Sequence, residues 1–294
     1  MSTPKWREPL IDPHTISFNN DLLLEEIIGY PHAWNDVFEC HGKKDGENID
    51  FYLKIQRDEK GNIKNEALIL PLIKNYNLPI PELLDVGKKG DFYYIVISSL
   101  NGQRLSTILE GFEDKKKESM KYMKSLGKML SYIHSLEVSS PKAKLRKINN
   151  IPIVDDLSKY PEIKPILEWL NSNMPAFKYN TFIHGDFHYA NVLWSEYQIS
   201  GVLDWEYSGQ GLKEQDIAWS LILRPSQKFM DSKQEVDLFL EGYRETGFYD
   251  EKKLRWCLIN GYVHFYIMNI AKNDEYCNKI IKIIYEILCY NFNG

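Results

Sequence analysis

Several features that mark specialised classes of protein are missing from this sequence. No apolar run approaches the roughly 20 residues that a membrane-spanning helix needs, and residues 1–20 contain Pro, His and Asp where a signal peptide would be apolar. The chain has only four cysteines and no C-x-x-C pair, so neither a disulfide framework nor a zinc knuckle is indicated. We therefore expect a cytoplasmic protein without a membrane partner.

An excess of basic charge is missing too. Lys and Arg number 36 against 41 Asp and Glu, whereas a nucleic-acid binder needs surplus cations to neutralise phosphates. No heptad seam or long exposed apolar helix stands out, so we expect a monomer with no nucleic-acid partner. The chain has 294 residues, 44% of them hydrophobic, which is enough to bury the core of one large domain or two modest ones.

The pattern of apolar residues changes near residue 100. Before it, alternation and turn residues predict strands at 22–28, 36–41, 50–56, 82–86 and 92–98, with one helix at about 62–76. Pro71 lies in that helix, and its ring removes a backbone hydrogen bond, so we expect a kink or a break there.

After Asn101-Gly102, apolar residues recur at three- and four-residue steps. This spacing predicts helices at 105–111, 116–136 and 161–171, a β segment over 181–194 and 199–205, and helices from 214 onward broken at Pro225, Gly247 and Asn273. The sequence thus predicts an α+β protein with an N-terminal lobe (1–100) and a mostly helical C-terminal lobe (101–294).

The most informative stretch is F-I-H-G-D-F-H-Y-A-N-V-L-W at 182–194, in which Asp186 and Asn191 bracket a loop at the end of an apolar strand. Asp204 ends a second apolar run, in G-V-L-D-W-E. Phosphoryl transfer from ATP needs a carboxylate that accepts the proton of the attacking hydroxyl, and oxygen ligands that hold Mg²⁺ on the phosphates. Asp186 suits the first role. A hairpin turning near 195–198 would bring Asn191 and Asp204 side by side for the second.

Upstream, Lys54 lies in the predicted strand F-Y-L-K-I at 51–55, on the face opposite Phe51, Leu53 and Ile55. From there its amine can reach the α- and β-phosphate oxygens of ATP. A long amine beside phosphate needs a carboxylate to fix it, and Glu66 on the following helix is the natural partner.

The order of these residues resembles the aminoglycoside phosphotransferase and choline kinase superfamily. The resemblance runs from about residue 27 to residue 219, and H-G-D-x-x-x-x-N followed by L-D-W-E is its most specific part. It implies a two-lobed protein-kinase-like fold, an ATP-dependent phosphotransferase acting on a hydroxyl, and ATP and Mg²⁺ as cofactors.

The resemblance also implies roles for residues around the motif and at the end of the N-terminal lobe. His184 and Asp216 would support the catalytic loop, and the adenine would contact Ser98, Ser99 and Leu100. The loop at 28–35 holds a single glycine instead of the G-x-G-x-x-G of protein kinases, so its contact with phosphate stays open, as does the choice between ATP and GTP.

The acceptor is the least determined part of the prediction. Aminoglycosides are cationic, so an antibiotic-resistance kinase is the first expectation if acidic side chains form a wall at the acceptor site. The candidates are Glu206, Glu241, Glu245, Asp274 and Glu275. Ordinary solvation of surface carboxylates explains the same residues equally well. Choline, homoserine, sugars and macrolides stay open as acceptors.

Two readings outside active kinases can be weighed. His184, Asp186 and a distant His264 could form the two-histidine, one-carboxylate triad of a non-haem iron oxygenase, but that requires a β-barrel, and residues 214–290 are predicted to be helical. An inactive kinase-like binding module would have lost one of its chemical residues, and none is replaced here. Activity is therefore expected.

Overall fold

The computed structural model describes residues 8–31, 34–58, 61–144, 146, 149–156, 158 and 160–289. The chain divides into two compact units. The N-terminal unit comprises residues 1–102, 193–195 and 199–207, and the C-terminal unit comprises 103–192, 196–198 and 208–294. The expected boundary after residue 100 lies next to this division, but the segment that carries Asp204, expected in the C-terminal lobe, groups with the N-terminal unit.

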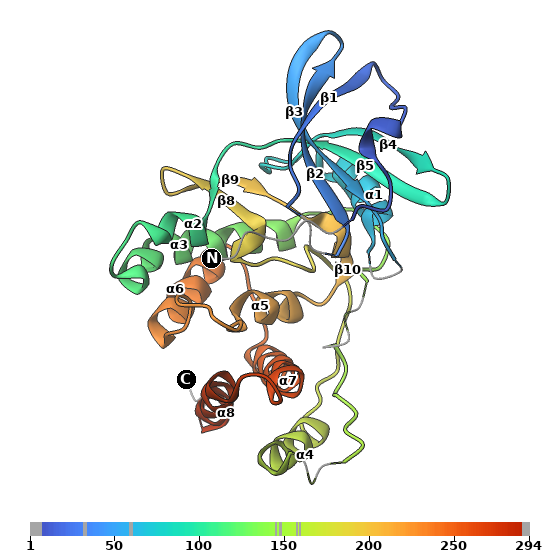
Figure 1. Ribbon diagram of the computed structural model, residues 1–294. Coiled ribbons are helices and arrows are strands. Elements are labelled where there is room, and N and C mark those ends of the chain that lie inside the picture. The colour runs from blue at the N-terminus through green and yellow to red at the C-terminus, as the bar shows by residue number, and fades with distance from the viewer. Residues whose placement is uncertain are drawn as a thin grey trace. The chain divides into compact units, whose positions relative to one another are not determined.

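The N-terminal unit is built on a five-stranded antiparallel sheet in the order β1-β2-β3-β5-β4 (Figure 1). Its elements are a 3₁₀ turn at Pro13–Thr15, β1 (Leu22–Gly29), β2 (Asp36–Lys44), β3 (Glu47–Ile55), α1 (Ile63–Ile73), β4 (Leu83–Lys89) and β5 (Phe92–Ser98). The β2–β3 hairpin turns at Asp45-Gly46, where both residues have positive φ (54° and 84°), as a tight two-residue hairpin requires. The predicted strands are all present.

One face of this sheet forms the core of the unit. Phe51, Leu53 and Ile55 on β3 are fully buried and pack with Phe38 and Cys40 on β2. Alternation along β3 directs Lys54 away from that cluster, between Val37 on β2 and Ile95 on β5. The position of Lys54 thus follows directly from the apolar pattern of its strand.

Helix α1 packs against β4 and β5. The break considered at Pro71 does not occur, since the helix runs through it to Ile73 and ends short of the expected residue 76. Pro71 lies in the last turn, where it removes only one intrahelical bond. The buried side chains of Leu70 and Ile73 stabilise that turn. A hairpin of β8 (Val192–Ser195) and β9 (Gln198–Val202) leads to a 3₁₀ turn, η6 (Trp205–Tyr207), which packs against α1.

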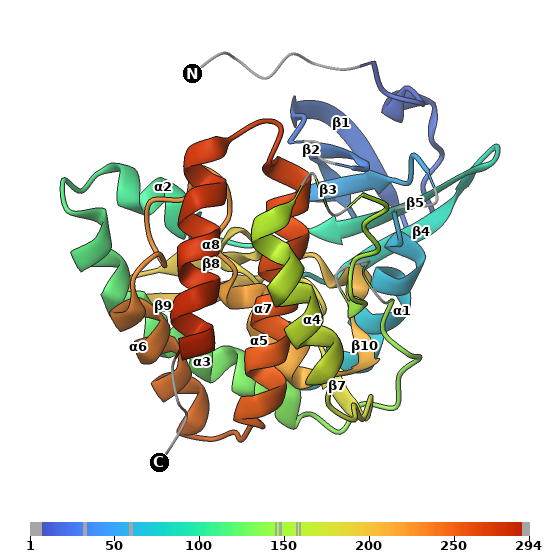
Figure 2. The ribbon, with the colours of Figure 1, turned by 90° about the horizontal axis from the view of Figure 1, so that it is seen from below.

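The C-terminal unit is mostly helical. Its elements are β6 (Gln103–Arg104), α2 (Leu105–Glu110), α3 (Lys115–Ser135), η4 (Pro161–Ile163), α4 (Lys164–Ser172), β7 (Thr181–Ile183), η5 (Tyr189–Asn191), β10 (Gly209–Gly211), α5 (Lys213–Leu221), α6 (Lys233–Arg244), α7 (Glu251–Asn269) and α8 (Asp274–Cys289). Helices α4, α7 and α8 lie side by side (Figure 2), and β7 pairs antiparallel with β10. The mixed α+β composition confirms the predicted fold class.

Helices α3 and α6 approach each other closely because each has a glycine at the crossing. A Cβ at Gly127 would lie 2.0 Å from the carbonyl oxygen of Phe239, and one at Gly242 would lie 2.1 Å from that of Lys124. Any larger residue would force the helices apart.

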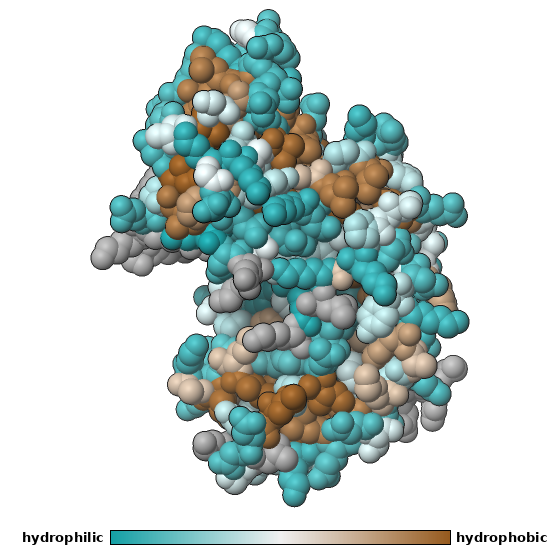
Figure 3. All heavy atoms as spheres, turned by 90° about the vertical axis from the view of Figure 1, so that its right-hand side faces the viewer, coloured by the Kyte–Doolittle hydropathy of each residue, from teal (hydrophilic) through white to brown (hydrophobic). Residues whose placement is uncertain are grey.

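Hydrophilic residues cover most of the face shown in Figure 3, and hydrophobic residues gather there in a few patches. In the part of the chain that the structure describes, no helix is both long enough and apolar enough to cross a membrane.

Candidate functional site

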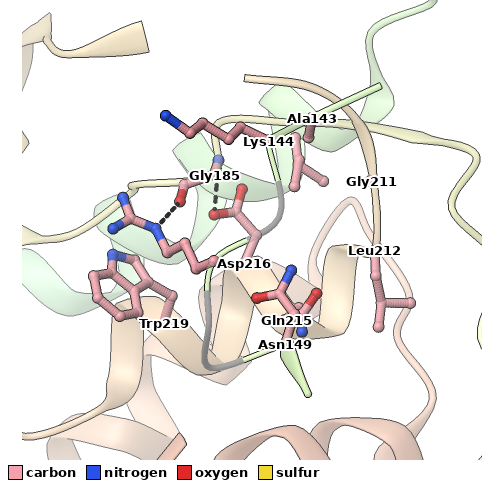
Figure 4. Close-up of a pocket in the computed structure, with 11 residues that line it drawn as sticks. Ala143, Lys144, Asn149, Gly185, Gly211, Leu212, Gln215, Asp216 and Trp219 are labelled. Carbon is pink, nitrogen blue, oxygen red and sulfur yellow. Dashed lines mark hydrogen bonds between the residues drawn. The ribbon is translucent and has the colours of Figure 1, made fainter. Parts of the chain in front are cut away.

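The loop that follows β7 is held in place by one carboxylate. Asp216, in the first turn of α5, accepts a hydrogen bond from the backbone N–H of His184 at 2.9 Å. It accepts another from the backbone N–H of Gly185 at 3.1 Å (Figure 4). Gly185 has φ of 77°, a left-handed conformation that glycine adopts without strain. These contacts turn the chain sharply, so that Asp186 follows directly after the bend.

Asp216 is itself fixed by His134 on α3, whose Nε2 lies 3.1 Å from Asp216 Oδ2 and whose Nδ1 lies 2.8 Å from the hydroxyl of Tyr243. Burial alone would raise the pKa of Asp216, but the hydrogen bond and charge of His134 and the loop N–H groups lower it below its ordinary value. Asp216 therefore stays ionised as the anchor of the loop. The buried His184 also contributes, since its Nδ1 accepts the backbone N–H of Asp186 at 3.2 Å.

The carboxylate of Asp186 is held by one hydrogen bond and one ion pair. Trp219 Nε1 donates to Asp186 Oδ1 at 2.7 Å, and Arg146 Nη2 lies 2.8 Å from the same oxygen. His188 Nε2 lies at 3.6 Å. The Asp186 side chain is 13% exposed, so it is accessible while being held. The two contacts orient a carboxylate whose ionised form can accept a proton.

Asn191 lies next to Asp186 in the C-terminal unit. Its amide nitrogen donates to the backbone carbonyl of Asp186 at 3.0 Å. Because the amide nitrogen donates this hydrogen bond, the amide oxygen of Asn191 is the atom that can coordinate a cation. The structure thus brings together four of the predicted residues: His184, Asp186, Asn191 and Asp216.

A second cluster lies in the N-terminal unit. Lys54 Nζ is 2.7 Å from Glu66 Oε2 and 3.2 Å from Asp204 Oδ1, and Glu66 is completely buried. Burial alone would lower the pKa of Lys54, but the charges of Glu66 and Asp204 raise it above its usual value, so the ammonium stays charged. Asp204 has φ of 69°, an uncommon conformation for a non-glycine residue that fits a functional position.

Glu206 completes this cluster from within the N-terminal unit. Its carboxylate is buried and accepts hydrogen bonds from Asn35 Nδ2 at 2.7 Å and from the backbone N–H of Asn62 at 2.9 Å. Burial, and then the charge of Asp204, raise the pKa of Glu206 to about 7. This environment differs from the exposed acceptor wall expected for Glu206.

The three carboxylates of the cluster have the chemistry of a divalent-cation site. One oxygen each from Glu66, Asp204 and Glu206 lie within 4.8 Å of one another. Hard oxygen donors suit Mg²⁺, and a nucleotide would supply phosphate oxygens as well. Asn191 and Asp204 belong to different units, so the expectation that they lie side by side stays a prediction.

The predicted adenine-contacting residues lie at the end of β5. Ser98 pairs with Phe51 on β3, and its hydroxyl accepts the backbone N–H of Glu82 at 2.9 Å. Ser99 donates its N–H to the carbonyl of Asp50, and Leu100 is partly exposed. A nucleotide contact at these three residues stays a prediction.

The other acidic residues considered for the acceptor are dispersed. Glu241 on α6 and Glu245, the residue that follows this helix, form surface ion pairs with Lys124 and Lys128 on α3. Asp274 and Glu275 are exposed in the first turn of α8, where acidic residues complement the helix dipole.

His264 lies on α7, as the helical prediction for this region required, and its Nε2 donates to the carbonyl of Asn150 at 2.7 Å. Among the described residues, the grouping of side chains able to hold a metal does not include His264.

Three functional candidates escaped the sequence reasoning: Arg146, Trp219 and Arg224. Trp219 lies on α5. Its position three residues after Asp216 places both side chains on one face of α5, which was a usable signal. Arg146 and Arg224 lie far from the motif in the chain, and no local pattern marks them. The pocket in Figure 4 is lined by Arg146, Gly185, Asp216 and Trp219, among others.

Comparison with known proteins assigns the chain to a family. The model of the phosphotransferase enzyme family matches residues 30–257, which is most of the chain. The chain belongs to the phosphotransferase enzyme family. The predicted superfamily is thereby confirmed.

Solved structures agree with this assignment at the level of the fold. A thermostable mutant of aminoglycoside phosphotransferase APH(4)-Ia in ternary complex with ADP and hygromycin B aligns with a TM-score of 0.62 at 15% identity, covering 92% of this chain and 94% of that one. ADP-bound aminoglycoside phosphotransferase APH(2'')-Ib aligns with a TM-score of 0.58 at 18% identity, covering 90% and 93%. The protein-kinase-like fold expected from the sequence is therefore confirmed.

Part of a much longer protein is also similar to this chain. The mouse (Mus musculus) protein acyl-CoA dehydrogenase family member 10 is 24% identical over 227 residues, which covers 71% of this chain and 20% of that protein. This phosphotransferase-family chain thus spans about a fifth of the length of that relative.

Proposed function

We propose that this protein is an ATP-dependent kinase that phosphorylates a hydroxyl group of a small molecule in the cytoplasm. The observation that carries the proposal is the environment of Asp186, an accessible carboxylate that Trp219 and Arg146 hold on a loop anchored by Asp216. Such a group is suited to receive one proton from an alcohol.

The reaction follows from these roles. The acceptor oxygen forms a bond to the γ-phosphorus of ATP, the bond from that phosphorus to the bridging oxygen of ADP breaks, and the hydroxyl proton passes to Asp186. Holding the two reactants in line, together with stabilisation of the phosphate charge, provides most of the acceleration. Asp186 contributes on the order of 10²- to 10⁴-fold as the base.

Nucleotide binding is assigned to the second cluster. Lys54, fixed by Glu66 at 2.7 Å, would contact phosphate oxygens, and Asp204 with Asn191 would hold Mg²⁺. Bound Mg²⁺ would supply charge neutralisation on the phosphates. Ser98, Ser99 and Leu100 are the proposed adenine contacts. The family assignment and the ADP-bound structural neighbours support nucleotide use.

The acceptors of those neighbours do not identify the acceptor of this chain. APH(2'')-IIa was solved in complex with gentamicin at 17% identity to this chain, a level at which the likeness concerns the fold alone. Aminoglycosides stay the first acceptors to test. Choline, homoserine and sugars are the alternatives.

The proposal is tested by ADP release from the purified protein with Mg²⁺ and ATP, and with GTP in parallel, across these acceptor classes. Asp186→Asn is the control, because it should retain nucleotide binding while losing turnover. Stimulation by an acceptor that disappears in the variant would support the kinase. Equal ADP release by the variant and the wild type would exclude Asp186 as the base.

A further inference from the structure

Two guanidinium groups flank Trp219, the side chain that donates to Asp186. The Cζ atoms of Arg146 and Arg224 lie 4.3 Å and 4.9 Å from the centroid of the Trp219 ring. Trp219 Nε1 in turn lies 2.7 Å from Asp186 Oδ1. Since a single indole touches all three charged groups, both cations are next to the carboxylate proposed to receive the acceptor proton.

Arg224 is fixed without being neutralised. It follows the end of α5 and donates from Nη1 to the carbonyl of Ile222 at 3.0 Å and from Nη2 to the carbonyl of Trp219 at 3.1 Å. Within the described part of the chain, no carboxylate lies at ion-pair distance from it. A guanidinium carries five N–H donors, and these two contacts leave others for a ligand. The carbonyl groups thus orient the cation, and Asp186 is the carboxylate whose charge acts on it most strongly.

The neighbouring side chains do not cancel this charge. Asp186 is already paired with Arg146 at 2.8 Å. His188 accepts the backbone N–H of Ala190 through Nδ1 at 3.3 Å, and burial, followed by the charge of Arg224, lowers its pKa well below the usual value. The imidazole of His188 is therefore neutral, and the single carboxylate of Asp186 faces the two guanidinium groups of Arg146 and Arg224, which leaves an excess of positive charge.

The charge at this point disfavours a cationic acceptor. Of the acidic residues considered for the acceptor, Glu241 and Glu245 are paired with lysines of α3, and Asp274 and Glu275 lie in the exposed first turn of α8. An acceptor with ammonium groups would instead face Arg146 and Arg224. An acceptor with a carboxylate or phosphate would find a preoriented planar donor, which suits both anions.

We propose that the acceptor of this kinase is a hydroxyl compound that also carries an anionic group, a carboxylate or a phosphate, and that Arg224 binds this group while the hydroxyl faces Asp186. The inference rests on the proposed function and names the substrate class of the same site. The competing role for Arg224 is contact with the γ-phosphate of ATP. That role predicts a loss of Mg·ATP affinity when Arg224 is replaced, and no change in the preference for anionic ligands.

The first experiment compares matched ligands on the wild-type protein loaded with Mg²⁺ and ADP, with binding followed by calorimetry. 3-Hydroxybutyrate is paired with its methyl ester, glycerol 3-phosphate with glycerol, and choline and an aminoglycoside provide the cationic arm. We expect the anionic member of at least one pair to bind on the order of 10- to 100-fold more tightly, the effect of a charge-assisted contact. The pair with the larger ratio separates carboxylate from phosphate.

The second experiment uses Arg224→Gln and the charge-retaining Arg224→Lys, with Arg244→Gln as the control. Arg244 is an exposed arginine on α6 paired with Glu251. We expect Arg224→Gln to abolish the preference for the anionic ligand and Arg224→Lys to retain part of it. The control Arg244→Gln should match the wild type in ligand preference, in Mg·ATP affinity and in ADP release without acceptor.

The outcomes separate the inference from the proposed function. If no anionic ligand binds more tightly than its neutral partner, or if the cationic compounds bind best, the inference is wrong while Mg·ATP binding keeps the kinase proposal standing. A loss of Mg·ATP affinity in Arg224→Gln with the ligand preference unchanged would assign Arg224 to the nucleotide instead. Absence of Mg·ATP binding by the wild type would overturn both.

Discussion

Trp219 donates its indole N–H to the Asp186 carboxylate at 2.7 Å, and Asp216, three residues earlier on α5, accepts the backbone N–H of Gly185. Residues three apart lie on one face of a helix. One helix therefore fixes both the backbone of the loop and the side chain of its proposed base. The precision of the site depends on where α5 begins.

Replacing Trp219 with Phe should lower turnover without unfolding the protein. The ring that Arg146 and Arg224 contact is kept, while the donor to Asp186 is lost. A hydrogen bond to a charged group contributes about 1.5–3 kcal/mol, which corresponds to a decrease in kcat on the order of 10-fold or more. Steady-state kinetics with the best acceptor measures it, and Trp169→Phe on α4 is the matched control. A kcat equal to that of the control would exclude an orienting role for Trp219.

Asp216→Asn should lower the stability of the protein near neutral pH and should make that stability less dependent on pH in the acid range. The pKa of Asp216 is lowered in the folded state, so its ionised form stabilises the protein at pH values above the ordinary carboxylate pKa. That contribution is lost as pH falls through the lowered value. An asparagine also directs an amide nitrogen at a backbone N–H, leaving a buried donor unsatisfied at about 1–3 kcal/mol.

The measurement is urea unfolding of both proteins between pH 7 and pH 3. The wild type should lose stability more steeply at the acid end than Asp216→Asn, because the variant has no carboxylate to protonate. Parallel curves for the two proteins would show that Asp216 does not contribute to the acid transition.

Much of the fold was predictable because its signals are local. The strand pattern at residues 51–55 located Lys54, and the apolar runs ending before Asp186 and Asp204 located both motifs. The family model and the neighbouring structures confirm the superfamily and the kinase-like fold. Of the kink or break expected at Pro71, the break does not occur, because the burial of Leu70 and Ile73 in the same turn outweighs the lost backbone bond.

The parts that could not be predicted depend on contacts between distant segments. His134 reaches Asp216 from α3, and Arg146 reaches Asp186 from the segment before α4. Neither residue stands in a motif, since an ordinary surface position has the same local pattern. The burial of Glu206 could not be predicted either. We considered this residue for the acceptor site, but its carboxylate accepts hydrogen bonds from Asn35 and Asn62 inside the N-terminal unit.

Removing Lys54 should destabilise the protein as well as impair nucleotide binding. Lys54→Met leaves the fully buried carboxylate of Glu66 without its cation, and breaking a buried pair in this way costs about 3–5 kcal/mol. The double variant Lys54→Met/Glu66→Gln removes the orphaned charge and should recover part of that loss. Urea unfolding measures the stabilities, and a binding titration measures Mg·ATP affinity. If the single variant were as stable as the wild type, the buried pair would not be coupled.

Asp204→Ala should eliminate the dependence of nucleotide affinity on Mg²⁺. The residue offers the carboxylate nearest Lys54 after Glu66, and its oxygen is grouped with those of Glu66 and Glu206 in an arrangement that suits a divalent cation. In wild-type protein, ATP affinity should rise as Mg²⁺ is added, because Asp204 would help to hold a metal ion that neutralises the phosphate charge. In the variant the titration should be flat. Asp91→Ala, at an exposed turn between β4 and β5, should behave like the wild type. A normal Mg²⁺ titration in Asp204→Ala would show that Asp204 does not bind the metal. Glu206, two residues later in the same group of carboxylates, would then be the next candidate ligand.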